Sequence, residues 1–195
     1  MFFFINTPIL DMFISDVEPL LAKKVAYRYY NLSELITKPA KLKMLYIARQ
    51  GEWRQILNEK EMIGNITTKC RGVVEFEKTH FEGKSHRSQI ISMRSTDILF
   101  GYHGAAFVNI MFMMPYSGFI EVFSPISRPR YYDMMAIRTQ LAYRCLTRNT
   151  FDRSKKRPRD GRNLNIFVDV NMVVEYVNQL AEIVSKHKYK IVNVI

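Results

Sequence analysis

The chain has 195 residues, 48% of them hydrophobic and 24% charged, which is enough for one domain with a sizeable core and excludes intrinsic disorder and collagen-like repeats. Its two cysteines, Cys70 and Cys145, exclude a disulfide scaffold and a four-cysteine zinc site. Lysine and arginine outnumber acidic residues by 29 to 18, and this charge of +11 favours an anionic partner such as nucleic acid, anionic lipid or the phosphates of a small ligand.

The first 41 residues are predicted to contain one helix, within residues 8–32. The apolar start at Met1 lacks the basic residues and the cleavage site of a signal peptide, and no run of about 18 apolar residues predicts a membrane span. An opening of this kind is typical of the interior of a longer protein. The residues that define the predicted apolar face follow helical spacing: Ile9, Met12, Phe13, Val17, Leu20, Leu21 and Val25.

Short apolar runs alternate with helical patterns from Leu42 to Leu146. This alternation predicts right-handed βαβ units, and therefore an α/β fold with a Rossmann-like parallel sheet and helices on both faces. A helix is predicted to begin after Asn58, with Met62, Ile63 and Ile66 on its apolar face, and the helix at 85–94 is expected to turn Ile90, Ile91 and Met93 toward the core. Strands are expected at 42–49, 72–76, 97–101, 118–123 and 143–146, and the other helices at 105–113 and 131–142.

The last fifty residues are predicted to contain an exposed loop and a long helix. The loop covers residues 147–166 and is basic, with six lysines and arginines between Arg153 and Arg162. The helix covers residues 168–188, and its last turn carries Lys186 and Lys188, where the helix dipole favours cations. Its apolar face is formed by Val170, Val173, Val174, Val177, Leu180, Ile183 and Val184.

Candidate ligand-binding residues follow the predicted strands, because ligands bind beyond the carboxyl ends of a parallel sheet. Small residues at Gly104 and Ala105 would let phosphate approach the backbone at the free N–H groups of a helix N-terminus. His103 adds a donor that can be charged near neutral pH. Arg49 and Arg54 follow the first strand, and their guanidinium groups suit phosphate oxygens.

Each of these residues also has a structural interpretation. A turn of small residues often serves only tight packing, and the two arginines could lie free on the surface. Asn58 could cap the helix that follows it instead of contacting a ligand. Glu121, inside the fourth strand, could hold ribose hydroxyls or an acceptor, or could simply face outward.

Two longer stretches are more specific: ARQGEWRQILNEKEM at 48–62 and DILFGYHGAAFVNIMFMMPYSGFIEVFSP at 97–125. They resemble the C-terminal domain of a GT-B glycosyltransferase family whose members modify EGF domains, dystroglycan and plant xylan. The resemblance covers residues 42–146. The chain departs from the family pattern with HGAA in place of HGAG and with Phe107 in place of a smaller aliphatic residue.

The resemblance implies a domain organisation and an activity. Residues 42–195 would be the nucleotide-sugar-binding, C-terminal half of a GT-B fold, and residues 1–41 a remnant of the region between its two domains, too short for an acceptor domain. The implied reaction is inverting transfer of N-acetylglucosamine or a pentose from a UDP-sugar to a protein or glycan hydroxyl, in the lumen of the endoplasmic reticulum or Golgi. The residues implied to bind the donor are Arg49, Arg54, Asn58, His103, Gly104, Ala105 and Glu121.

The implied site uses side-chain charges to stabilise the leaving diphosphate, so no metal or other cofactor is expected, and no general base is assigned. His80, His86 and His187 show no metal-ligand spacing with the cysteines. Two other functions stay open: an inactive sugar-nucleotide-binding module, and a basic nucleic-acid-binding protein. Only the net charge supports the latter, so nucleic acid is not an expected partner. Glycosylation sequons begin at Asn31 and Asn65, but such triplets are also common by chance.

Overall fold

The computed structural model describes residues 15, 17–34, 37–151 and 163–189. Its centre is a five-stranded sheet in the order β2-β1-β3-β4-β5, in which every neighbouring pair is parallel. The strands are β1 (Leu42–Ile47), β2 (Val74–Thr79), β3 (Ile98–Tyr102), β4 (Gly118–Val122) and β5 (Ala142–Leu146). The predicted α/β class with a parallel sheet is therefore confirmed.

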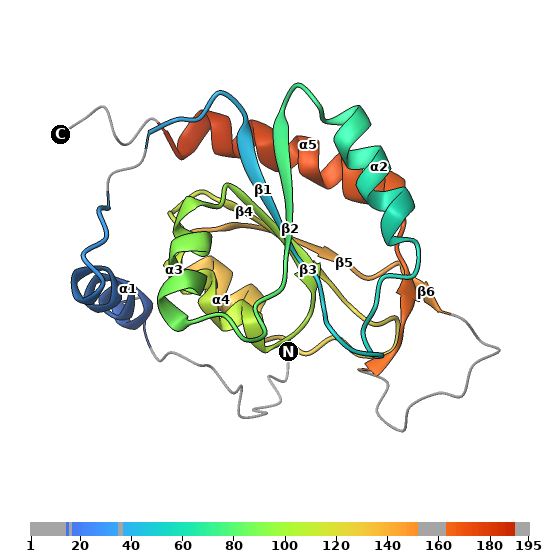
Figure 1. The fold of residues 1–195 in the computed structure, drawn as a ribbon, viewed down its shortest axis with the longest axis horizontal. Coiled ribbons are helices and arrows are strands. Elements are labelled where there is room, and N and C mark those ends of the chain that lie inside the picture. The colour runs from blue at the N-terminus through green and yellow to red at the C-terminus, as the bar shows by residue number, and fades with distance from the viewer. Residues whose placement is uncertain (1–14, 16, 35–36, 152–162, 190–195) are drawn as a thin grey trace, which may run out of the picture.

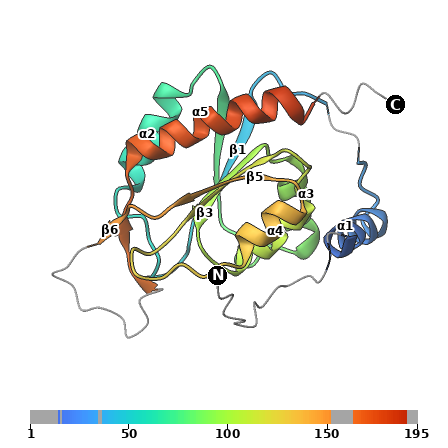
Figure 2. The same cartoon turned by 180° about the vertical axis from the view of Figure 1, so that it is seen from behind.

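Helices cover both faces of the sheet (Figures 1 and 2). One face packs against α2 (Glu59–Lys69) and α5 (Val170–His187). The other packs against α3 (His86–Ser95), the 3-10 helix η1 (Ala105–Phe112) and α4 (Tyr132–Arg138), with α1 (Val17–Tyr29) outside this layer. Together these helices bury the central strands β1, β3 and β4 on both faces, whereas the edge strands β2 and β5 keep partly exposed residues.

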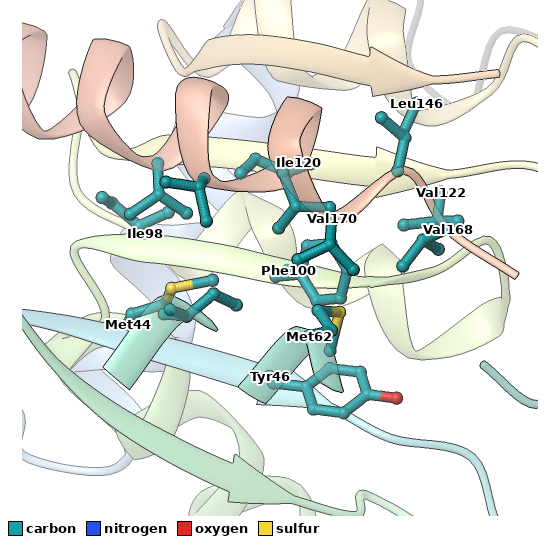
Figure 3. Packing of buried hydrophobic residues seen from close by; sticks show 14 of the residues in the cluster. Met44, Tyr46, Met62, Ile98, Phe100, Ile120, Val122, Leu146, Val168 and Val170 are labelled. Carbon is teal, nitrogen blue, oxygen red and sulfur yellow. The ribbon is translucent and has the colours of Figure 1, made fainter. Parts of the chain in front are cut away.

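Successive residues of each strand point to opposite faces, so the apolar runs supply two cores. In β1, Met44 and Tyr46 join the core under α2 and α5, whereas Leu45 and Ile47 join the core under α3 and η1. Figure 3 shows the first of these cores, where Met44 and Tyr46 gather with Phe100 and Met62. A strand buried on both faces reads as a continuous apolar run, which is why these runs predicted a covered parallel sheet.

The predicted N-terminal helix is present as α1, but the prediction of its buried face was wrong. Val17, Leu21 and Val25 are 57%, 55% and 68% exposed, and Leu20 is also exposed. Lys23 and Tyr27 are buried instead. Ile9, Met12 and Phe13 lie outside the described residues.

The polar side of α1 is buried because it completes the end of η1. The Lys23 ammonium donates to the carbonyl of Met113 at 3.1 Å, and the Tyr27 hydroxyl donates to the carbonyl of Phe112 at 2.7 Å. The last carbonyls of a helix have no partner within it, and these two side chains satisfy them.

Three further expectations need correction. Ile91 of α3 is 37% exposed, because only Ile90 and Met93 turn toward the core. The predicted helix at 131–142 ends at Arg138, and β5 already begins at Ala142. The predicted loop at 147–166 has ordered ends: β6 (Thr150–Phe151) and β7 (Ile166–Phe167) pair antiparallel, and Leu164 and Ile166 are buried. Its basic stretch from Arg153 to Arg162 lies outside the described residues.

The long C-terminal helix is confirmed as α5, but Lys188 after it is buried rather than exposed at a helix end. Its ammonium contacts Asp97 Oδ1 at 2.6 Å and donates to the carbonyl of Thr96 at 2.9 Å. The other oxygen of Asp97 accepts from the backbone N–H of Lys43 at 2.7 Å. Burial lowers the pKa of Lys188, and the charge of Asp97 opposes that shift. This pair ties the end of α5 to the start of β3.

Among the described residues, none of the helices combines the length and apolarity that crossing a membrane requires.

Candidate functional site

The candidate site lies at the carboxyl ends of β1, β3 and β4. Ile47 pairs with Gly101, and Gly101 pairs with Glu121, so the residues that follow β1 and β3 lie beside Glu121 of β4. Arg49 and His103 therefore meet although they are 54 residues apart in the sequence. This register brings the polar residues that follow these strands to one edge of the sheet, as expected for the carboxyl ends of parallel strands.

Two guanidinium groups converge on the turn after β3. Arg49 donates to the carbonyl of His103 at 3.1 Å, and Arg54 donates to the same carbonyl at 3.4 Å. Burial, and next the neighbouring charge of Arg54, lower the pKa of Arg49. Two like charges held this close in a half-buried place repel each other, and an anionic ligand would relieve that cost.

Gly104 makes room for Arg49 to lie across this turn. A Cβ built on Gly104 would lie 1.5 Å from a terminal nitrogen of the Arg49 guanidinium. Ala105 follows as the exposed first residue of η1, where the first backbone N–H groups have no acceptor within the helix. The turn thus brings backbone donors and a guanidinium to the same place.

The buried carboxylate of Glu121 holds the His103 ring through its Nδ1 atom. This atom lies 2.5 Å from Glu121 Oε1, and the hydroxyl of Tyr143 donates to Glu121 Oε2 at 2.9 Å. Glu121 is fully buried, and this burial raises the pKa of its carboxyl while His103 opposes the shift. Both carboxylate oxygens therefore have partners within the domain, and one of these partners is the His103 ring. The ring also stacks on Phe123, with 5.2 Å between centroids.

Asn58 occupies the N-cap position of α2 without a side-chain cap bond. Its amide instead pairs with the backbone of Val168: Oδ1 accepts from the N–H at 2.9 Å and Nδ2 donates to the carbonyl at 3.0 Å. The structure therefore brings Arg49, Arg54, His103, Gly104, Ala105 and Glu121 together, and it uses Asn58 to join α2 to the segment before α5.

A cavity of about 370 Å³ opens beside Arg49, between α3 and η1. Glu82, His86 and Gln89 line it together with Arg49 and Ala105. Asn109 Nδ2 donates to Gln89 Oε1 at 2.9 Å on its wall. The cavity is within the usual size range of small-ligand pockets and adjoins the converging arginines.

Sequence reasoning missed Tyr143, Gln55 and Asn165. Tyr143 was placed in a strand, but its contact with Glu121 depends on the β4–β5 pairing. Gln55 and Asn165 hold the loop that carries Arg54, through hydrogen bonds that span 110 residues of sequence. No local pattern marks such partners.

The polar groups gathered here suit an anion rather than a cation, because two arginines and a histidine dominate. Among the residues that the structure describes, no cluster of three or more His, Cys, Asp or Glu side chains is placed to hold a metal ion. That no metal or other cofactor takes part stays a prediction from the sequence.

Comparison with known proteins identifies the family. The model of the glycosyltransferase 61 family matches residues 10–120, more than half of the chain. The chain is 25% identical to the EGF domain-specific O-linked N-acetylglucosamine transferase of Drosophila melanogaster, over 76% of this chain and 29% of that protein. It is 24% identical to the same enzyme of Pan troglodytes, over 69% of this chain and 26% of that protein. The chain thus spans less than a third of these curated relatives. The chain belongs to the glycosyltransferase 61 family.

Proposed function

We propose that this chain binds the diphosphate of a UDP-sugar and forms the donor-binding part of an inverting glycosyltransferase. The observation that carries the proposal is the convergence of Arg49 and Arg54 on the carbonyl of His103, beside a turn that Gly104 opens. Charge-assisted hydrogen bonds from guanidinium groups and backbone amides are the usual means of holding phosphate oxygens. Residues 42–195 are the proposed donor-binding domain, and residues 1–41 the proposed interdomain segment.

The donor and the acceptor belong to the same proposal. The names of the relatives favour N-acetylglucosamine as the sugar and an EGF domain as the acceptor, with a pentose and a glycan hydroxyl as the other candidates. The match spans less than a third of each relative. We therefore propose sugar transfer as an activity of the whole protein, and donor binding as the part that this chain plays in it.

The proposed mechanism uses electrostatic stabilisation of the leaving group. As the acceptor hydroxyl attacks the anomeric carbon and gives up its proton to a general base, the bond from that carbon to the β-phosphate oxygen breaks and negative charge develops on the diphosphate. Arg49, Arg54 and the His103 ring already lie where they can meet that charge, so little reorganisation is needed during the reaction. We propose that these side chains take the place of a metal ion. Glu121 keeps the His103 ring in orientation from behind.

Binding of UDP tests the site directly. We expect Arg54→Ala and His103→Ala each to weaken UDP binding about 10- to 100-fold in calorimetry, because a charge-assisted hydrogen bond contributes about 1.5–3 kcal/mol. The matched control is Arg71→Ala, which removes an exposed arginine after α2 and should leave affinity unchanged. An equal loss in all three variants would show that UDP responds to net charge rather than to this site.

Location in the lumen of the endoplasmic reticulum or Golgi is part of the same proposal, and the two sequons allow it to be tested. Asn31 is exposed in the turn after α1, whereas Asn65 lies within α2 with its amide donating to the carbonyl of Glu61 at 3.0 Å. We expect the protein expressed in its own cells to shift on gels after peptide-N-glycosidase treatment. Asn31→Gln should abolish that shift and Asn65→Gln should not. A protein without any such glycan would contradict the lumenal location.

A further inference from the structure

The loop between β1 and α2 carries both arginines of the candidate site but contains no helix or strand of its own. Within the loop, Gln55 shares its side-chain amide among three carbonyls, those of Arg49 at 3.3 Å, Gly51 at 3.0 Å and Trp53 at 3.3 Å. These contacts curl the loop around Gln55. They do not attach it to the rest of the domain.

The attachment comes from residues 165–168, just before α5. Asn165 Oδ1 accepts from the backbone N–H of Gln55 at 2.9 Å, and Asn165 Nδ2 donates to the carbonyl of Glu52 at 2.8 Å. The backbone of Ile166 adds two bonds, donating to the carbonyl of Gln55 at 2.9 Å and accepting from the N–H of Leu57 at 2.7 Å. The two hydrogen bonds of Asn165 therefore hold the loop backbone on either side of Arg54, at Glu52 and at Gln55.

Arg54 is the residue in this loop that most needs to be held. Its φ is +58°, in the left-handed region that residues with a side chain rarely adopt. Such a conformation persists only where its surroundings fix it. The flanking bonds from Asn165 supply that constraint, and the Arg54 guanidinium then lies 3.4 Å from the carbonyl of His103.

We propose that Asn165 is a positioning residue for the diphosphate site, acting through the backbone of Arg54; this inference rests on the proposed function. Asn165 lies outside residues 10–120, which match the family model. Its side chain reaches the loop backbone at Glu52 and Gln55, so its contribution to ligand binding passes through Arg54.

A double-mutant cycle distinguishes this role from a merely structural one. UDP affinity is measured by calorimetry for the wild type, Asn165→Ala, Arg54→Ala and the double variant. We expect Asn165→Ala to weaken binding about 10-fold in the wild-type background and to have no further effect once Arg54 is alanine, because coupled residues are not additive. The matched control is Asn171→Ala, an exposed asparagine in the first turn of α5, which should bind like the wild type.

A second variant keeps the test decisive if Asn165→Ala does not fold. Asn165→Asp retains the acceptor for the Gln55 N–H but places an oxygen against the Glu52 carbonyl, so we expect its affinity to fall below that of the wild type. Hydrogen exchange without ligand should be faster at the Gln55 amide in Asn165→Ala, which lacks the acceptor, than in Asn165→Asp, which keeps it.

The outcomes separate the two proposals. If the wild type does not bind UDP, or if Arg54→Ala binds as tightly as the wild type, the proposed site fails and this inference fails with it. If Arg54→Ala loses affinity but the Asn165 variants do not, only the role of Asn165 is overturned. Equal losses from Asn165→Ala in both backgrounds also overturn it, because the effect would then not pass through Arg54.

Discussion

Replacing Lys188 with methionine is expected to lower the free energy of unfolding by about 3–5 kcal/mol, the usual cost of removing one partner from a buried ion pair. The side chains of Lys188 and Asp97 are each 1% exposed, and the ammonium lies 2.6 Å from Asp97 Oδ1. Without Lys188, the Asp97 carboxylate is left charged in the interior. Urea unfolding followed by circular dichroism gives the difference.

Two variants control this measurement. Lys186→Met removes an exposed lysine two residues earlier and should change stability by less than about 0.5 kcal/mol. The double variant Asp97→Asn with Lys188→Met removes both charges and should recover part of the loss, because the remaining groups are neutral. A Lys188→Met protein as stable as Lys186→Met would show that the pair makes no net contribution.

Removing the Glu121 carboxylate should damage both the fold and the site. Glu121→Ala leaves His103 Nδ1 and the Tyr143 hydroxyl without their partner, and we expect a loss of about 3 kcal/mol in stability from the charged hydrogen bonds. Because the His103 ring then loses the carboxylate that orients it, UDP affinity should fall about 10-fold. Calorimetry and urea unfolding measure the two effects. Glu75→Ala, at an exposed position on β2, should change neither, and UDP affinity retained in Glu121→Ala would contradict the role assigned to this carboxylate.

The same carboxylate gives a pH dependence with a defined sign. Burial raises the pKa of Glu121 in the folded state. Its contribution to stability is therefore fully present below the unfolded-state pKa and is lost as the pH rises through the folded-state pKa. Glu121→Gln keeps a donor toward His103 and an acceptor for Tyr143 but does not ionise. Its stability relative to the wild type should consequently rise between pH 4 and pH 7, and a constant difference across this range would contradict the assignment.

The sequence was most informative about features that depend on local patterns. The apolar runs that became β1 and β3 predicted a covered parallel sheet, and the position of His103 after a strand predicted its place at the sheet edge. The apolar residues of α1 do not mark its buried face. Lys23 and Tyr27 instead reach the carbonyls of Met113 and Phe112, which no periodicity reveals.

Partners far apart in the sequence were the least predictable part of the site. Asn58 was expected to cap a helix or contact a ligand, and it pairs with Val168, 110 residues away. Gln55 and Asn165 are separated by the same distance and have no shared motif. Their contact depends on how β7 and the start of α5 return to the edge of the sheet, which requires the assembled fold.

The long-range attachment of the arginine loop sets an order of events during synthesis. The strands of the sheet and every residue around His103 have left the ribosome once Leu146 has emerged. The loop that carries Arg54 then still lacks Asn165 and Ile166, and Asp97 still lacks Lys188. Contacts of such high sequence separation form late and slowly. A nascent or truncated chain ending near Leu146 therefore contains all the predicted ligand-binding residues but lacks the residues that anchor the Arg54 loop and the ion-pair partner of Asp97. Such a chain is the kind of partly folded species that chaperones retain.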